Sequence, residues 1–275
     1  MLKRPFSRCP LCDAALDRCD LHRVADISNH PLYSAELPAQ LSWLRCGVCG
    51  HVFTRDYWTA EGEAIVFAKT LPYQMPGVQQ CEPLRGVWAP AVARVAALLC
   101  TARSRAEVFG ATGTARPFWI DVGFGNGALL TTADEFGFDT LGIDVRTAAV
   151  KQLIAAGYRA TCIDFDDFTT DTPVCVLSLC DALEHMCDPR AALRKAHRLL
   201  GNDGLLYLSL PNSETATWRQ WEATHTNPYW GELEHYHNFS RTRLVELLAL
   251  HGFAVVDYYV SSRYYSCLEI TARKA

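Results

Sequence analysis

Four cysteines near the start of the chain form two pairs that could bind a metal ion. Cys9 and Cys12 make one C-x-x-C pair, Cys46 and Cys49 make the second, and residues 13–45 separate them. Two intervening residues let both thiolates of a pair turn toward one centre, and four thiolates enclose a tetrahedral Zn²⁺ with no position left for water. The spacing therefore predicts a structural zinc site. Other residues that could replace one ligand are Cys19, His22, His30 and His51.

A glycine-rich stretch, WIDVGFGNGALL, is the second pattern that could do chemistry. Gly123, Gly125 and Gly127 directly follow an apolar run that contains Asp121. The spacing G-x-G-x-G differs from the dinucleotide pattern G-x-G-x-x-G, and the triphosphate loop G-x-x-x-x-G-K-[ST] does not occur in the sequence. Asp144 ends the next apolar run, where its carboxylate can accept hydrogen bonds from both hydroxyls of a ribose. These residues predict a nucleoside site without a phosphate cradle.

Strand-like and helix-like segments alternate around the glycine loop. A helix is expected to begin at Asp188-Pro189 and end at Gly201, and another to begin at Ser240 and end at Gly252. Such alternation predicts a mostly parallel sheet with helices on both faces, and ligands of such sheets bind beyond the carboxyl ends of the strands. The apolar runs that predict strands are 118–122, 140–145, 159–164, 174–179, 204–210, 253–260 and 266–272.

These stretches together resemble the class I S-adenosylmethionine-dependent methyltransferases. IDVGFGNGALL is similar to the first motif of that family, LGIDV to its acidic second motif, and CIDFDDF to the segment that flanks adenine. Residues 174–212 are similar to the stretch from the fourth strand through the fifth, and the likeness extends over about 118–275. Phe124 departs from the pattern, because a small residue or cysteine is commoner there, and it is expected near the methionine part of the cofactor.

The resemblance implies a three-layer Rossmann-like methyltransferase sheet and S-adenosylmethionine as cofactor. Its sulfonium is cationic and its adenosine neutral, so glycines that allow close backbone approach and an acidic ribose ligand suit it. The residues expected to contact the cofactor are Asp121, Gly123, Phe124, Gly125, Asn126, Gly127, Asp144, Val145, Asp164, Phe165, Cys180 and Asp181.

Two segments offer acid–base groups to a methyl acceptor. His185 follows the fourth predicted strand, and NPYWGELEHYHNFS lies between the fifth strand and the next helix. Removing a proton from a hydroxyl or an acidic carbon needs a base. We expect His185 and His235 to be acid/base or acceptor-orienting residues, with Glu234 holding an imidazole. The alternative is that both histidines are structural and bind backbone groups.

The sequence leaves three functions open. The LEH and H-x-x-x-F-S features resemble the branch with small acceptors, where sugar C-methyltransferases carry a zinc module and a Glu-His pair, so we expect methylation of a hydroxyl or carbon of a sugar or natural-product intermediate. A ribosomal RNA base methyltransferase with a zinc-ribbon recognition module is the second candidate, disfavoured by the net charge of -4. An inactive cofactor-binding scaffold is the third.

The sequence predicts three parts: a zinc-ribbon-like module over 1–58, a connector over 59–116 and a methyltransferase domain over 117–275. In the connector, Pro90 lies within an apolar stripe, so the helix there either begins near Ala89 or kinks at the proline. The chain is 49% apolar and 20% charged, and it contains no long uncharged apolar run. We expect a cytoplasmic protein with no membrane partner and with its twelve cysteines reduced. The oligomeric state does not follow from these patterns.

Overall fold

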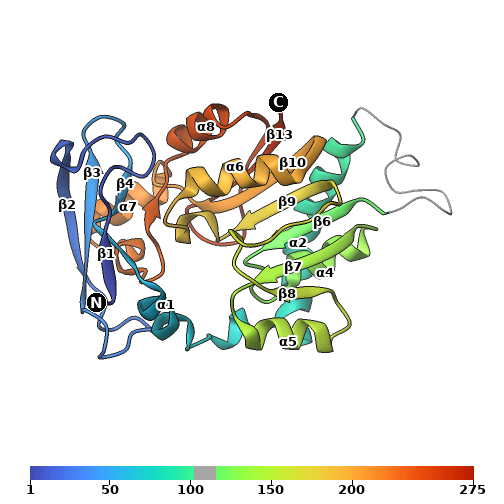
Figure 1. Ribbon diagram of the computed structural model, residues 1–275, viewed down its shortest axis with the longest axis horizontal. Helices are drawn as coiled ribbons and strands as arrows, with labels where there is room; N and C mark the ends of the chain where they lie inside the picture. Colours follow the sequence, from blue (N-terminus) through green and yellow to red (C-terminus); the bar gives the residue numbers. More distant parts are fainter. Residues whose placement is uncertain (102–115) are drawn as a thin grey trace.

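A computed structural model describes residues 1–101 and 116–275 (Figure 1). The strands are β1 (Lys3–Pro5), β2 (Cys19–Asp26), β3 (Gln40–Cys46), β4 (Val52–Thr54), β5 (Asp56–Trp58), β6 (Phe118–Val122), β7 (Asp139–Asp144), β8 (Ala160–Cys162), β9 (Val174–Cys180), β10 (Leu200–Pro211), β11 (His237–Asn238), β12 (Phe253–Val260) and β13 (Cys267–Lys274). The helices are α1 (Ala60–Phe67), α2 (Val78–Leu99), α4 (Ala128–Glu135), α5 (Thr147–Ala155), α6 (Pro189–Leu199), α7 (Ala216–Thr224) and α8 (Arg241–Leu250). Single 3₁₀ turns lie at Leu16–Arg18, Pro72–Gln74, Leu183–His185 and Pro228–Gly231.

The central sheet has seven strands in the order β12-β13-β10-β9-β6-β7-β8. The five strands from β10 to β8 are parallel, whereas β13 is antiparallel to both β10 and β12. Each of the seven apolar runs in the sequence forms one of these strands, so the predicted α/β sheet is confirmed. Because β6, β7 and β9 are neighbours, the loops after them meet at one edge of the sheet.

Helices cover both faces of this sheet, as the side chains of β10 demonstrate. Leu205 and Tyr207 belong to a core with Trp88 of α2, whereas Leu206 and Leu208 belong to the core that contains Leu193 of α6. Alternate residues of a strand point to opposite faces, so α2 and α6 lie on opposite sides of the sheet. Figure 1 shows the same three layers.

The predicted start at Asp188-Pro189 and both predicted ends of the helix from Ser240 to Gly252 are confirmed. The predicted end at Gly201 is wrong, because α6 ends at Leu199 and the chain passes directly into β10, which contains Gly201. Asp188 accepts a hydrogen bond from the amide of Ala191 at 3.0 Å, and Pro189 occupies the first position of α6. Ser240 caps α8 in the same way, and Gly252 follows this helix with a φ of 78°. These caps satisfy amides that have no partner inside the helix.

The connector contains one long helix, for which the sequence left two alternatives. Helix α2 begins at Val78 and contains both Pro83 and Pro90. The start near Ala89 is therefore wrong and the helix continues through the proline, because Trp88 and the apolar side chains after it pack against α4 and the sheet. Part of the connector, 102–115, lies outside the described residues.

The N-terminal part forms a four-stranded sheet in the order β11-β4-β3-β2. Its outer strand, β11, comes from the second half of the chain and pairs antiparallel with β4. Residues 52–58 form two short strands, β4 and β5, of which β5 pairs with β1. The sheet is thus completed by the same segment that carries the predicted acid–base residues.

The N-terminal module also shares its core with the rest of the protein. The indole nitrogen of Trp43 donates to the main-chain oxygen of Trp230 at 2.9 Å, and that of Trp58 donates to Leu233 at 3.0 Å. Both tryptophans are almost fully buried. Packing against residues 227–239 therefore supplies apolar contacts that the short cysteine-bearing segment lacks.

Among the described residues, no helix is both long and apolar enough to cross a membrane.

Candidate active site and cysteine cluster

A cavity of about 760 Å³ opens beyond the carboxyl ends of β6, β7 and β9. This size suits a drug-sized ligand or cofactor. It is where a doubly wound sheet is expected to bind ligands. The predicted cofactor residues that line it are Asp121, Gly123, Phe124, Gly125, Asn126, Asp144, Val145, Asp164, Phe165, Cys180 and Asp181.

The glycine loop forms a tight turn between β6 and α4. Gly123, Gly125 and Gly127 have φ values of 68°, 57° and 78°, a region that favours glycine. Gly127 is not among the residues that line the cavity. It precedes α4, and a Cβ there would lie 3.0 Å from Cδ1 of Leu153. The first two glycines therefore bring backbone to the cavity, whereas the third lets the start of α4 lie close to Leu153 of α5.

Asp144 is buried at the end of β7 and is engaged by Arg146. Its Oδ1 accepts from the amide and Nε of Arg146, each at 2.9 Å, and its Oδ2 accepts from Nη2 at 2.6 Å. Both side chains lie at the cavity wall. The carboxylate is oriented by these contacts. Oδ1 already accepts two hydrogen bonds, whereas Oδ2 accepts one and keeps lone-pair capacity for a further donor.

Asp121 lies deeper, on β6, with 2% of its surface exposed. Its Oδ1 accepts from the hydroxyl of Ser178 at 2.6 Å, and that hydroxyl in turn accepts from the indole of Trp119 at 2.9 Å. Burial raises the pKa of the Asp121 carboxyl to about 7, and the hydrogen bond from Ser178 opposes the rise. A positive charge bound in the cavity would favour its ionised form.

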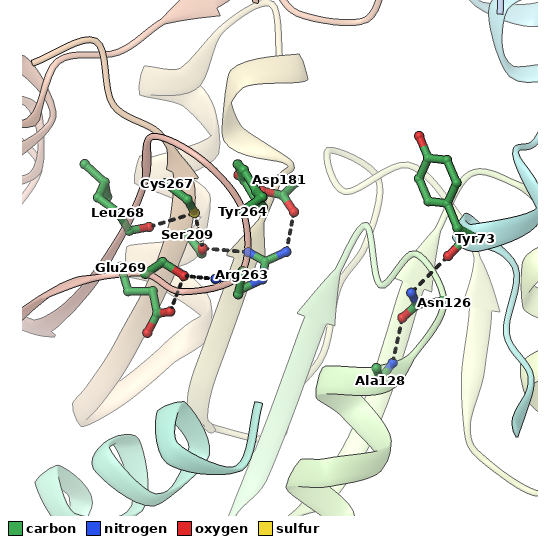
Figure 2. A network of polar contacts seen from close by, with 11 residues as sticks. Tyr73, Asn126, Ala128, Asp181, Ser209, Arg263, Tyr264, Cys267, Leu268 and Glu269 are labelled. Atoms are coloured by element: carbon green, nitrogen blue, oxygen red, sulfur yellow. Dashed lines mark hydrogen bonds and ion pairs between the residues drawn. The ribbon is translucent and has the colours of Figure 1, made fainter. Parts of the chain in front are cut away.

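Asp181 is held by two residues that the sequence did not point to. Figure 2 shows Arg263 and Tyr264, from the hairpin between β12 and β13, reaching the carboxylate of Asp181, which has a φ of 52°. Arg263 also donates to the hydroxyl of Ser209 at 2.6 Å, and its guanidinium lies 4.1 Å from the ring centroid of Trp88. The hairpin therefore closes one wall of the cavity.

The opposite wall comes from the connector. Asn126 donates through its side-chain amide to the main-chain oxygen of Tyr73 at 3.0 Å, and its Oδ1 accepts from the amide of Ala128 at 3.1 Å (Figure 2). Tyr73 and Gln74 both line the cavity. The segment before α2 is thus tied directly to the glycine loop.

Glu184, His185 and His235 form a compact cluster beside this cavity. One potential ligand atom from each of the three lies within 4.8 Å of the others. The two imidazole rings meet edge to face with centroids 4.7 Å apart. His185 lines the cavity, whereas His235 is buried behind it and is not among the lining residues. Glu184 is a member of the site that the prediction of the catalytic residues omitted.

Burial sets the protonation of this cluster. It raises the pKa of the Glu184 carboxyl to about 7 and lowers the pKa of the His235 imidazole to about 3. Like-charge repulsion from His185 lowers the His235 pKa further. Near neutral pH, His235 is therefore an uncharged imidazole, and Glu184 is close to its midpoint of ionisation.

Glu234 contacts His185 by a different group from the one expected. The main-chain oxygen of Glu234 lies 3.0 Å from Nδ1 of His185. A carbonyl only accepts, so this nitrogen carries the proton and Nε2 keeps its lone pair. No hydrogen bond between the Glu234 carboxylate and an imidazole is found in the described part of the chain. The Glu234 side chain lines the cavity instead.

The charges at the cavity wall are mostly negative. The lining arginines within the described residues are Arg146 and Arg263, and each is paired with a lining carboxylate. The lining carboxyl groups are Glu63, Asp121, Asp144, Asp164, Asp166, Asp181, Asp188 and Glu234. This lining favours a cationic or neutral ligand and repels phosphate.

The four cysteines predicted to bind metal are brought together. One ligand atom from each of Cys9, Cys12, Cys46 and Cys49 lies within 4.8 Å of the others. The sulfur atoms of Cys9 and Cys49 are 3.7 Å apart, and those of Cys12 and Cys46 are 3.6 Å apart. Tetrahedral Zn–S bonds place sulfurs about 3.8 Å apart, so these distances fit a four-thiolate site. Gly50 has a φ of 75°, as the second turn requires.

His51, which follows the second cysteine pair, connects that pair to His237 in the segment 227–239. Its Nε2 lies 3.0 Å from Nδ1 of His237, whose Nε2 lies 2.9 Å from the main-chain oxygen of Met186. Met186 lines the cavity. Neither His51 nor Cys19 belongs to the four-cysteine group, so the exchange of a ligand for either residue has no support from this geometry.

Comparisons with known proteins agree with this fold. A family model described as a methyltransferase domain matches residues 92–258. Magnesium protoporphyrin IX methyltransferase from Synechocystis PCC 6803, solved with S-adenosylhomocysteine, is 17% identical, with coverage of 74% of this chain and 89% of that chain and a TM-score of 0.51. An S-adenosylmethionine-dependent methyltransferase from Clostridium acetobutylicum is 10% identical, with coverage of 69% and 91% and a TM-score of 0.51.

A third similar structure is a chain of the complex between the Trm112 methyltransferase activator and a methyltransferase from Haloferax volcanii. It is 15% identical and covers 71% of this chain and 94% of that chain, with a TM-score of 0.52. At these identities the likeness is one of fold. No curated protein matches the sequence.

Proposed function

Because this chain belongs to the methyltransferase-domain family, which makes it an S-adenosylmethionine-dependent methyltransferase, we propose that it methylates a hydroxyl group or a carbon atom of a small molecule. The acceptor would be a sugar or a natural-product intermediate. The observation that carries this proposal is the acidic cavity of about 760 Å³ with the Glu184–His185–His235 cluster beside it. Such a cavity admits a small neutral acceptor and provides groups that can activate it.

The cavity also fits the cofactor, which supplies an activated methyl group on a positively charged sulfur. Asp144 would accept a hydrogen bond from a ribose hydroxyl through Oδ2, because its carboxylate is fixed at the end of β7 and this oxygen keeps an acceptor site. Gly123 and Gly125 would let the amino-acid end approach the backbone closely. Asp164 and Phe165, which follow β8, would flank the adenine.

The cluster would activate the acceptor. His185 keeps the lone pair of Nε2 because its Nδ1 proton is held by the main chain of Glu234. Glu184 can gain or lose a proton near neutral pH, since burial places its pKa at about 7. A positioned acid or base contributes about 100-fold to 10,000-fold to such reactions.

The test is methyl transfer to a panel of hydroxylated and carbon-acid small molecules, followed as S-adenosylhomocysteine formed. With a responsive acceptor, His185→Gln is expected to lower kcat by about 100-fold or more and to leave binding of S-adenosylhomocysteine unchanged. His251→Gln, which changes a histidine outside the lining of the cavity, is the matched control. Equal losses in both variants, or no loss in His185→Gln, would remove the cluster from the mechanism.

The RNA alternative is disfavoured by the charge of the cavity wall, because phosphate contacts dominate RNA affinity. Retention of ribosomal RNA fragments on the protein at moderate salt would reverse this assignment. An inactive scaffold would bind the cofactor product yet transfer no methyl group to any member of the panel.

Cofactor affinity should depend on the ionisation of Asp121. The pKa of its carboxyl is about 7, and the cationic cofactor prefers the carboxylate. We therefore expect S-adenosylmethionine to bind about tenfold more tightly at pH 7.5 than at pH 6. Calorimetry at the two pH values measures this change, and Asp121→Asn should flatten it. An unchanged pH profile in that variant would assign the effect to another group.

We further propose that Cys9, Cys12, Cys46 and Cys49 hold a structural zinc ion. The support is the distance between the sulfur atoms of Cys9 and Cys49, 3.7 Å, and between those of Cys12 and Cys46, 3.6 Å, together with a donor set of four thiolates. Such a site leaves no open position, so its role would be to stabilise the fold.

A further inference from the structure

The Glu184–His185–His235 cluster joins two segments that are far apart in the sequence. Glu184 and His185 lie in the 3₁₀ turn after β9, whereas His235 lies just before β11. Their ligand atoms converge within 4.8 Å, and the hydrogen bond from Tyr236 N to Glu184 O, 2.9 Å long, fixes the two segments together. The convergence is therefore a property of the fold and not of one flexible loop.

Two members of this cluster have unsatisfied polar atoms. Glu184 is 1% exposed, and neither of its carboxylate oxygens has a hydrogen-bond partner within the part of the chain that the structure describes. Nδ1 of His235, in a side chain that is 8% exposed, is likewise without a partner among those residues. Buried carboxylates are normally paired or bound to a metal ion, so this arrangement lacks a positive partner.

The guanidinium of Arg263 does not supply this positive charge to Glu184. Arg263 is committed to Asp181 and to the hydroxyl of Ser209. His185 uses its Nδ1 proton for the main chain of Glu234 and is left with a lone pair on Nε2. The cluster thus offers a carboxylate and imidazole lone pairs to one centre, which are acceptors and not donors.

We propose that Glu184, His185 and His235 bind a divalent cation. Two imidazoles and one carboxylate form the donor set of open sites for Zn²⁺, Fe²⁺ and Mn²⁺, in which other positions remain for water or substrate. His185 lines the cavity, so the open positions would face it. The cation would also offset the excess of carboxylates at the cavity wall.

This site rests on the proposed function and deepens it. With the cation bound, the lone pairs of the cluster would hold the cation and would not accept a proton, so activation of the acceptor would pass from these side chains to the cation. An acceptor with two adjacent oxygens, such as a diol, a hydroxy-ketone or a catechol, would chelate the cation through its open positions. A bound cation lowers the pKa of a hydroxyl that it coordinates, and it also fixes the orientation of the acceptor. The proposal therefore narrows the acceptor to small molecules with vicinal oxygens.

The experiment uses the full chain with zinc in the cysteine cluster and titrates it with Mn²⁺, followed by electron paramagnetic resonance. Mn²⁺ favours oxygen and nitrogen over thiolate ligands, so it reports on this cluster and not on the cysteines. We expect one Mn²⁺ per chain, with binding weakened at least about tenfold in Glu184→Gln and in His235→Gln. Glu63→Gln, which removes another carboxylate from the same cavity, should bind Mn²⁺ like the unaltered protein.

Thermal melting and binding of S-adenosylhomocysteine establish that each variant is folded, and His235→Gln carries the test if Glu184→Gln does not fold. Absence of Mn²⁺ binding at millimolar concentration, or equal binding in the cluster variants and in Glu63→Gln, would overturn the proposal. Methyl transfer that persists in protein freed of Mn²⁺ and other added cations would keep the proposed function and reject the cation. Cation binding without methyl transfer to any acceptor would keep the cation site and reject the proposed function.

Discussion

Replacing Asp144 by Asn is expected to weaken binding of S-adenosylhomocysteine by roughly 100-fold, or about 3 kcal/mol. The carboxylate at the end of β7 would accept a hydrogen bond from a ribose hydroxyl through Oδ2, and an amide loses the negative charge and one acceptor. Asn has nearly the same volume, and it still offers an oxygen to Arg146, so the fold should be retained. Calorimetry with the purified protein measures the effect.

Arg146→Gln is the matched control for this prediction. It removes the guanidinium that now engages both oxygens of Asp144 and leaves the carboxylate itself in place. We expect its affinity for S-adenosylhomocysteine to fall by less than that of Asp144→Asn, because the carboxylate is still present and keeps its hydrogen bond from the amide of residue 146. If Asp144→Asn binds normally while Arg146→Gln does not, the ribose contact has been assigned to the wrong side chain.

Replacing Cys46 by Ser is expected to abolish zinc binding and to lower the melting temperature by about 10 °C or more. Cys46 is almost fully buried at the end of β3, and a four-thiolate site cannot keep its geometry with three sulfurs. Because β4 pairs with β11, the loss of zinc should also disturb the segment 227–239, which carries His235, and reduce methyl transfer. Elemental analysis and scanning calorimetry give the two readouts.

Cys19→Ser provides the control for the cysteine cluster. Cys19 faces Cys46 across the β2–β3 pair but is not one of the four grouped sulfurs. We expect this variant to keep one zinc per chain and nearly the same melting temperature. A variant without zinc would show that Cys19 is a ligand and that one member of the proposed set is not.

The sheet could be predicted from the sequence because each of its strands is a separate apolar run. Buried parallel strands require apolar side chains on both faces, and glycines, prolines and capping residues mark the intervening helices. The approach of Asp144 to the glycine loop followed from the same rule, since neighbouring parallel strands end at one edge. The sequence could not decide between a helix start near Ala89 and a helix that continues through Pro90, because the outcome depends on packing of the apolar face against the sheet.

The side chains that close the cavity could not be predicted in this way. Arg263 and Tyr264 lie in a hairpin whose position depends on antiparallel pairing of β12 and β13, and they reach Asp181 across more than eighty residues of sequence. No periodic pattern marks them. The burial of Glu184 is equally non-local, since it follows from packing of the segment before β11 against the turn after β9.

The two-residue strand β11 was also missed, because two residues carry no detectable alternation. Its partner, β4, belongs to the N-terminal sheet, so the pairing is visible only in three dimensions. His237 in β11 meets His51 beside the second cysteine pair. The sequence correctly grouped the four cysteines, but it gave no sign that their module packs against the segment that carries His235.

The pairing of β11 with β4 has a consequence for recombination and protein engineering. Residues 1–58 are continuous in the gene, yet the unit that packs as one body includes 227–239 as well. A chimera that exchanges residues 1–58 alone would pair a foreign strand with β11 and disturb the segment that carries His235. The transferable cassette is therefore discontinuous, and relatives that differ in acceptor should differ in both pieces together.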